Sequence, residues 1–164
     1  MPILTTLRNG LAIKRVYLTR KYYVSAGVLF EAWSNETILK QWWGPHGFTN
    51  PVCIVDSKPG GRITIYMKAP DGMIFPLHGM FYEVFAPTRL VFATSAFEDG
   101  YGNSAFDNLN TVLFTAGHGY TLLSLDAQVT KSTPEADEAL ADMEESWQQS
   151  LDKLDELLKG QILC

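Results

Sequence analysis

The sequence is poor in cysteine, in basic charge and in long apolar runs, and each shortage excludes a class of protein. Its two cysteines, Cys53 and Cys164, are too few for a disulfide framework or a cysteine-based zinc site. The chain has thirteen lysines and arginines but eighteen acidic residues. The resulting net charge of −5 argues against nucleic-acid binding, which needs a basic stripe. No window approaches about 18 uninterrupted apolar residues, so the sequence predicts no membrane insertion.

The motifs of common catalytic and metal sites are also missing. The sequence has no G-x-S-x-G nucleophile elbow and no phosphate-binding loop, and no pair among its three histidines has metal-ligand spacing. We therefore expect no catalytic residue, no metal and no cofactor. Residues 1–15 lack the continuous apolar core of a secretory signal, which makes a cytoplasmic protein the expectation.

What the chain does have is the composition of a single globular domain. It is 46% hydrophobic and 19% charged, and its 164 residues suffice to bury a substantial core. No internal repeat or linker divides it. We expect an N-terminal extension over 1–15, one domain over 16–160 and a short tail over 161–164. Cys53 lies in an apolar run and is predicted to be a buried free thiol.

The longest periodic stretch runs from Pro134 to Lys159. Its apolar residues recur every three or four positions and so share one face of a helix. They are Leu140, Met143, Trp147, Leu151, Leu154 and Leu158. The pattern predicts one long amphipathic helix, capped by Ser132 or Thr133 and ended by Gly160. Because helix propensity alone does not stabilise such a helix, its apolar stripe must lie on another surface.

Most of the remaining sequence predicts strands joined by tight turns. Val16 to Val24 is β-branched and aromatic, which predicts a strand. Ser25 favours the start of a first short helix, and Gly44–Pro45 would end a second short helix that follows it. Strand patterns then follow over 52–57, 62–68, 75–85, 90–97, 111–116 and 120–130, while 98–110 has the composition of a loop. Such a meander predicts an α+β fold, in which a curved antiparallel sheet of about six to seven strands wraps around the long helix.

The order of short motifs along the chain resembles one known superfamily. The motifs are Phe30–Glu31–Ala32–Trp33, Trp42–Trp43–Gly44–Pro45, Gly79-x-Phe81-x-Glu83–Val84, Pro87-x-Arg89–Leu90–Val91–Phe92, Gly119-x-Thr121-x-Leu123-x-Leu125 and Trp147-x-x-Ser150–Leu151. In them the sequence is similar to the SRPBCC (START-like, helix-grip) superfamily, and most closely to its activator of heat-shock chaperone ATPase homologue-like branch. The similarity spans 16–159. It departs at Ser146, where the family usually has glycine, and over 98–110, which has no clear counterpart.

The resemblance implies a helix-grip fold with a hydrophobic cavity between the sheet and the C-terminal helix. The superfamily includes lipid carriers, polyketide cyclases, hormone receptors and co-chaperone domains, so the fold alone leaves the function open. The main expectation is binding of an apolar or amphipathic small molecule, without catalysis. The alternatives are a polyketide cyclase- or dehydratase-like enzyme, and a co-chaperone-like domain that acts on a heat-shock chaperone ATPase.

The residues expected to line the cavity are aromatic or aliphatic, as ligand pockets generally are. They are Trp33, Trp42, Phe48, Ile63, Ile65, Met67, Phe81, Phe92, Phe114, Trp147, Leu151 and Leu154. Close packing of the same residues into a solid core is the alternative. Arg20 is expected to face inward and to need a partner, which is either Glu83 or an anionic group of the ligand. His46 is the candidate for a proton shuttle at the cavity mouth.

Overall fold

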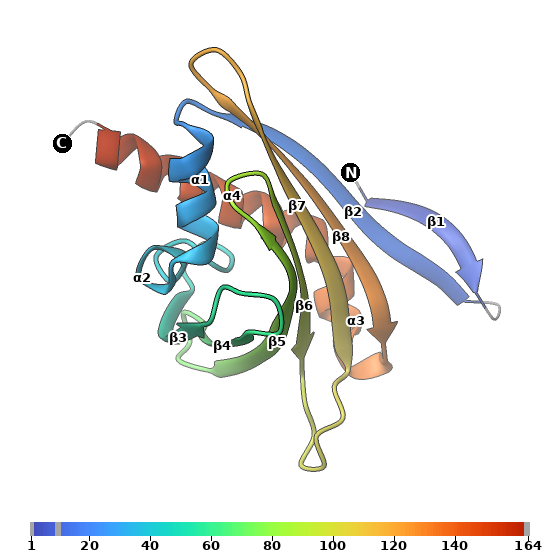
Figure 1. The fold of residues 1–164 in the computed structure, drawn as a ribbon. Helices are drawn as coiled ribbons and strands as arrows, with labels where there is room; N and C mark the ends of the chain where they lie inside the picture. Colours follow the sequence, from blue (N-terminus) through green and yellow to red (C-terminus); the bar gives the residue numbers. More distant parts are fainter. Residues whose placement is uncertain (1, 9–10, 163–164) are drawn as a thin grey trace.

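The fold is a curved antiparallel sheet that wraps around a C-terminal helix (Figure 1). The computed structural model describes residues 2–8 and 11–162, with side chains from residue 14 to residue 160. The strands are β1 (Pro2–Arg8), β2 (Leu11–Tyr22), β3 (Thr49–Val55), β4 (Arg62–Lys68), β5 (Ile74–Phe85), β6 (Arg89–Ala96), β7 (Phe106–Ala116) and β8 (Thr121–Ser132). The helices are α1 (Ala26–Ser34), α2 (Glu36–Leu39), the 3-10 turn η1 (Pro134–Ala136), α3 (Asp137–Ala141) and α4 (Met143–Ile162).

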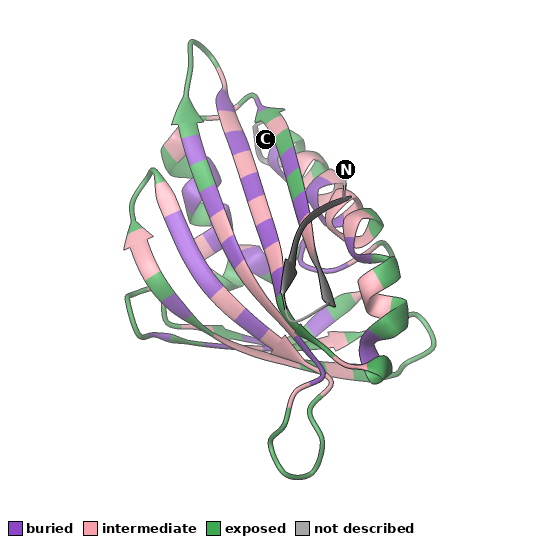
Figure 2. Ribbon diagram, turned by 90° about the vertical axis from the view of Figure 1, so that its right-hand side faces the viewer, coloured by how far each residue is buried: buried purple, intermediate pink, exposed green. Residues whose placement is uncertain are grey.

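The strands form one eight-stranded sheet in the order β1-β2-β8-β7-β6-β5-β4-β3. Figure 1 shows α4 lying across the concave side of this sheet, with α1 and α2 at one open end. The predicted α+β helix-grip architecture is therefore confirmed. Buried and exposed residues alternate along the strands, as Figure 2 shows, because successive side chains point to opposite faces. One face of the sheet packs on α4 and the other is the outer face.

The eighth strand comes from the region expected to be an N-terminal extension. β2 begins at Leu11, and β1 pairs with it from Pro2↔Val16 to Arg8↔Leu11. β1 lies at one edge of the sheet formed by the described residues, next to β2. The strand structure of its seven residues depends on pairing with β2. Their sequence pattern alone therefore did not predict a strand.

The predicted loop over 98–110 is shorter in the structure. β7 begins at Phe106, which pairs with Ala96 of β6 and with Ser132 of β8. The polar residues Asp107 and Asn108 suggested a loop, but ladder pairing on both sides overrides their low strand propensity. The connection between β6 and β7 therefore covers only residues 97–105.

The predicted long helix is interrupted. A 3-10 turn and the short helix α3 precede α4, and Asp142 between them has φ −93° and ψ 3°, outside the helical region. Thr133 lies at the N-cap position, but its side chain makes no cap hydrogen bond. The prediction that Gly160 ends the helix is wrong, because α4 continues to Ile162. The predicted apolar face is confirmed at its centre, where Leu151 and Leu154 are fully buried.

The two short helices begin at polar caps. Ser25 accepts a hydrogen bond from the amide of Val28 at 3.2 Å, which confirms it as an N-cap, and Asn35 caps α2 in the same way through Thr37. α2 ends at Leu39, before the predicted stop, and the chain turns through Gly44 at φ +93°. These caps fix where α1 begins and so where Trp33 enters the core.

Cys53 is a buried free thiol, as predicted. Burial, with a smaller contribution from the nearby Glu36 carboxylate, raises its pKa to about 11. At neutral pH it is protonated and behaves as a small apolar core residue. Cys164 lies outside the described residues.

Candidate functional site

All four tryptophans of the chain meet in one cluster between the short helices and α4. Trp33 of α1 packs on Trp42 with ring centroids 4.7 Å apart, and stacks on Trp147 of α4 at 6.0 Å. Trp43 closes the group by meeting Trp147 edge to face at 5.4 Å. Phe92 on β6 lies within 6.4 Å of both Trp33 and Trp43. The cluster therefore joins three elements that are far apart in the sequence.

Two rings of the cluster, Trp33 and Trp43, lie on a void of about 10 Å³ between the short helices and the sheet. The residues that line it are Trp33, Leu39, Trp43, Val55, Ile63, Ile65, Phe81 and Phe92. A space of this size holds about one water molecule, so the rings themselves fill the interior. Where the resemblance implied a hydrophobic cavity, the described residues place this small void among packed aromatic rings.

The structure places the predicted lining residues in three groups. Those on the void are Trp33, Ile63, Ile65, Phe81 and Phe92. Those in the same buried core but away from the void are Trp42, Phe114, Leu151 and Leu154, while Trp147 is partly buried beside them. Met67 packs on the edge of the core, and Phe48 lies against Phe75 at 6.3 Å.

Sequence reasoning missed three residues that line the void. They are Leu39, Trp43 and Val55. Trp43 lies in the Trp42–Trp43–Gly44–Pro45 motif, which was a usable signal, but only one of two adjacent tryptophans was expected to face inward. The turns after α2 let both rings enter the core, since Trp42 is 0% and Trp43 is 7% exposed.

Two buried polar atoms in this interior lack a partner within the described part of the chain. The indole N–H of Trp33, a residue only 2% exposed, donates to nothing, whereas that of Trp42 donates to the carbonyl of Ala32 at 3.0 Å. The Oδ1 of Asn110, a residue only 1% exposed, accepts nothing. An unpaired buried polar group costs about 1–3 kcal/mol. The interior thus holds one unused donor beside the void and one unused acceptor on β7.

A lysine on α4 holds the loop over residues 43–48, which we call the 43–48 loop. The Nζ of Lys153 lies 3.2 to 3.5 Å from four backbone carbonyl oxygens. They belong to Trp43, Gly44, Pro45 and Phe48. Desolvation of the ammonium lowers the pKa of Lys153. The sequence placed this lysine on the polar face of the helix and gave no sign of the carbonyls, which only the folded loop brings together.

We expect Lys153→Met to lower the free energy of unfolding by about 1–3 kcal/mol, because the substitution removes charge-assisted hydrogen bonds while keeping the aliphatic stem. Amide exchange of His46, whose N–H donates to Gln149 at 3.0 Å, should accelerate. The matched control is Lys159→Met on the same helix, which removes an exposed ion pair and should leave the free energy of unfolding nearly unchanged. Urea unfolding and hydrogen exchange measure both effects; equal losses in the two variants would contradict this role.

Arg20 does face the helix side of the sheet, but its partner is not Glu83. The guanidinium lies 2.6 Å from the carboxylate of Asp152 and 2.7 Å from the side-chain oxygen of Gln148, both on α4. A β-bulge between Phe81 and Glu83 shifts the register and reverses the expected parity. Glu83 pairs instead with Arg89 at 3.4 Å. The predicted Arg20–Glu83 pair is therefore wrong.

The last polar candidate from the sequence is His46. His46 is exposed in the 43–48 loop and does not line the void. In the part of the chain that the structure describes, no three histidine, cysteine, aspartate or glutamate residues gather as a metal site. No helix among the described residues is long and apolar enough to span a membrane.

A family model described as activator of Hsp90 ATPase homolog 1-like protein matches residues 23–159. The chain belongs to this family. The match covers the same part of the chain as the motifs, from the end of β2 to α4, and confirms the resemblance to the SRPBCC superfamily.

Solved structures share the fold over most of the chain. The AHSA1 protein from Silicibacter pomeroyi is 25% identical, covers 90% of this chain and 99% of its own, and has a TM-score of 0.75. A protein from Nitrosomonas europaea is 22% identical, with coverages of 92% and 97% and a TM-score of 0.75. One from Arthrobacter aurescens is 20% identical, with coverages of 89% and 86% and a TM-score of 0.77. No functionally curated protein matches the sequence.

Proposed function

We propose that the protein binds an apolar small molecule that carries a hydrogen-bond acceptor, in the aromatic interior between the sheet and α4. The observation that carries this proposal is the unpaired indole N–H of Trp33, a buried donor beside the void. A carbonyl or ether oxygen on the ligand would satisfy it and recover the cost of leaving it unpaired. The unpaired oxygen of Asn110 offers a second, accepting position on the same concave face.

Binding requires the rings to move, because the void of about 10 Å³ is smaller than any apolar ligand. The movable part is the outer side of the cluster. Trp147 is only partly buried, and Trp43 begins the 43–48 loop, which polar contacts from Lys153 hold in place. Displacement of Trp43, which lines the void, together with Trp147, which packs against it, would enlarge the void while the sheet stays unchanged. The proposal is therefore an interior that the rings close and that opens on the side of α4 to admit a ligand.

Intrinsic tryptophan fluorescence tests this proposal, because all four tryptophans lie in the cluster. The probes are 2-octanone and 1-octene, which have equal chain lengths but differ in the acceptor. We expect a saturable change with both, and tighter binding of the ketone by about 2- to 10-fold, the value of one neutral hydrogen bond. No saturable change with either probe would overturn the proposal.

A pair of variants assigns the preference to one N–H group. Trp33→Phe keeps an aromatic ring but removes the unpaired donor, so the ketone and the alkene should bind equally. Trp42→Phe is the matched control, because its N–H is already engaged with Ala32, and it should retain the preference for the ketone. A preference that survives Trp33→Phe would contradict the assigned role of this donor.

The chaperone partner and the cyclase-like activity that the resemblance implied stay predictions. The described residues place an aromatic cluster in the interior, and this cluster makes binding the proposal to test first. The buried Tyr22 hydroxyl, for example, donates to the carbonyl of Leu151 at 3.1 Å, and burial raises its pKa.

A further inference from the structure

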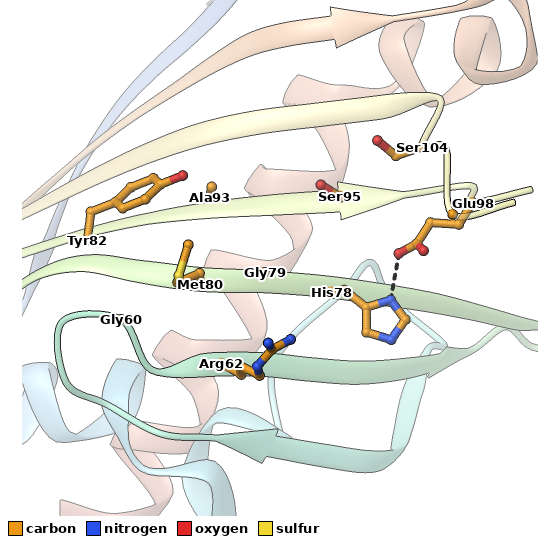
Figure 3. A pocket seen from close by; sticks show the side chains of 11 residues that line it. Gly60, Arg62, His78, Gly79, Met80, Tyr82, Ala93, Ser95, Glu98 and Ser104 are labelled. Atoms are coloured by element: carbon orange, nitrogen blue, oxygen red, sulfur yellow. Dashed lines mark hydrogen bonds and ion pairs between the residues drawn. The ribbon is translucent and has the colours of Figure 1, made fainter.

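A second hollow lies on the opposite face of the sheet from the tryptophan cluster. It is a groove of about 380 Å³ over β4, β5 and β6, which we call the outer groove. Figure 3 shows it with α4 behind the sheet. Its principal side chains are Arg62, His78, Met80, Tyr82, Ala93 and Glu98. The volume falls within the range of small-molecule sites, roughly 300–1,000 Å³.

The groove exists because small residues lie between large ones on the outer face. Ala93 and Ser95 of β6 are the cross-strand partners of Met80 and His78 of β5. Their short side chains leave space above β6, while the larger side chains of β5 rise beside it (Figure 3). The same alternation places Phe81 and Phe92, the next residues along these strands, on the void inside.

The charged groups around the groove differ in whether they have a partner. His78 Nδ1 lies 2.7 Å from the carboxylate of Glu98, so that acidic group is engaged at one end. Arg62 has no hydrogen bond or ion pair to any described side chain, and its guanidinium points from β4 toward β5 (Figure 3). A guanidinium presents a planar fork of donors that fits a carboxylate or phosphate. The groove thus combines an unpaired cation with an apolar floor.

One wall of the groove comes from the 97–105 connection, through Glu98, Gly102 and Ser104. Asp99 organises this connection by accepting from the amides of Tyr101 at 2.7 Å and Asn103 at 3.0 Å, and these bonds lower its pKa. This segment is also where the sequence departs from the family motifs. The groove is therefore built in part from a segment outside the family motifs found in the sequence.

We propose that the outer groove binds a small amphipathic anion. Its carboxylate or phosphate pairs with Arg62, and its apolar part lies over Ala93 between Met80 and Tyr82. This site is separate from the interior site, because the two lie on opposite faces of β5 and β6. A neutral apolar molecule suits the interior, and an anion with an apolar body suits the groove.

An NMR titration with 2-naphthoate tests the proposal. We expect saturable amide shifts at Met80, Ala93 and Ser95, and weaker binding of the neutral analogue 2-naphthalenemethanol. Arg62→Gln should raise the Kd for naphthoate about fivefold or more, because it removes the fork that holds the carboxylate. Lys68→Gln is the matched control, since it removes the same charge from the other end of β4 and lies outside the groove, and it should change the Kd by less than about twofold.

A third variant tests the apolar floor. Ala93→Leu keeps Arg62 but fills the space above β6, and it should abolish the saturable shifts while the rest of the spectrum stays folded. Equal effects of Arg62→Gln and Lys68→Gln would show general electrostatic attraction only and would overturn the proposal. Shifts at the tryptophan indole signals without shifts at Ala93 would place naphthoate in the interior and would also overturn it.

Discussion

Leu154→Ala is expected to lower the free energy of unfolding by about 3–5 kcal/mol, one of the two largest losses we predict for a single substitution. Leu154 is 0% exposed and lies near the middle of α4, in the core cluster that includes the tryptophans. Truncation removes apolar contacts and leaves a cavity that stiff aromatic rings cannot easily collapse to fill. The loss should therefore lie toward the upper end of values for buried leucines.

Urea unfolding monitored by tryptophan fluorescence measures this loss. Leu157→Ala is the matched control, since it makes the same truncation on the same helix at a residue that is only partly buried. We expect it to cost less than about half as much, because burial sets the transfer free energy. Similar losses for the two leucines would show that α4 does not seal the core through the predicted face.

Gly79→Ala is expected to cost about 2–4 kcal/mol, for a reason of space rather than of backbone conformation. A Cβ atom at residue 79 would lie 2.1 Å from the carbonyl oxygen of Ala93. That atom belongs to the backbone of the neighbouring strand, so relief requires β5 and β6 to separate. The strands at this point carry both Phe81 on the inner face and Met80 on the outer face, so both candidate sites should be disturbed.

Thermal unfolding followed by circular dichroism tests this expectation, with a loss of roughly 4–16 °C in Tm for a domain of this size. Gly100→Ala is the control, because an added Cβ there meets no atom within 4 Å and the residue lies in the loop. Its effect should stay within about 0.5 kcal/mol. A Gly79→Ala variant as stable as Gly100→Ala would show that the two strands can separate at little cost.

The two proposed sites follow from a single property of strands. Neighbouring residues on β5 and β6 point to opposite faces, so one pair of strands contributes aromatic rings to the interior and a small-residue floor to the outer groove. The interior is closed by packing and must rearrange to accept a ligand. The outer groove is already open, and its cation is already unpaired.

Elements with local signals could be predicted from the sequence alone. The alternation over Arg62–Lys68 predicted β4 to the residue, and Ser25 marked the start of α1. The helical spacing of Leu151 and Leu154 identified the face of α4 that lies on the sheet. Such patterns follow from the periods of strand and helix, two and 3.6 residues, and need no knowledge of the partner surface.

How these elements meet depends on contacts between residues that are distant in the sequence. The bulge between Phe81 and Glu83 reversed the side-chain parity and gave Arg20 a partner on α4 instead. The carbonyls around Lys153 converge only when the 43–48 loop closes on the helix. Whether the space under α4 is full or empty depends on ring orientations and side-chain volumes summed over several elements, so no periodicity in the sequence could show that Trp33, Trp43 and Trp147 fill it.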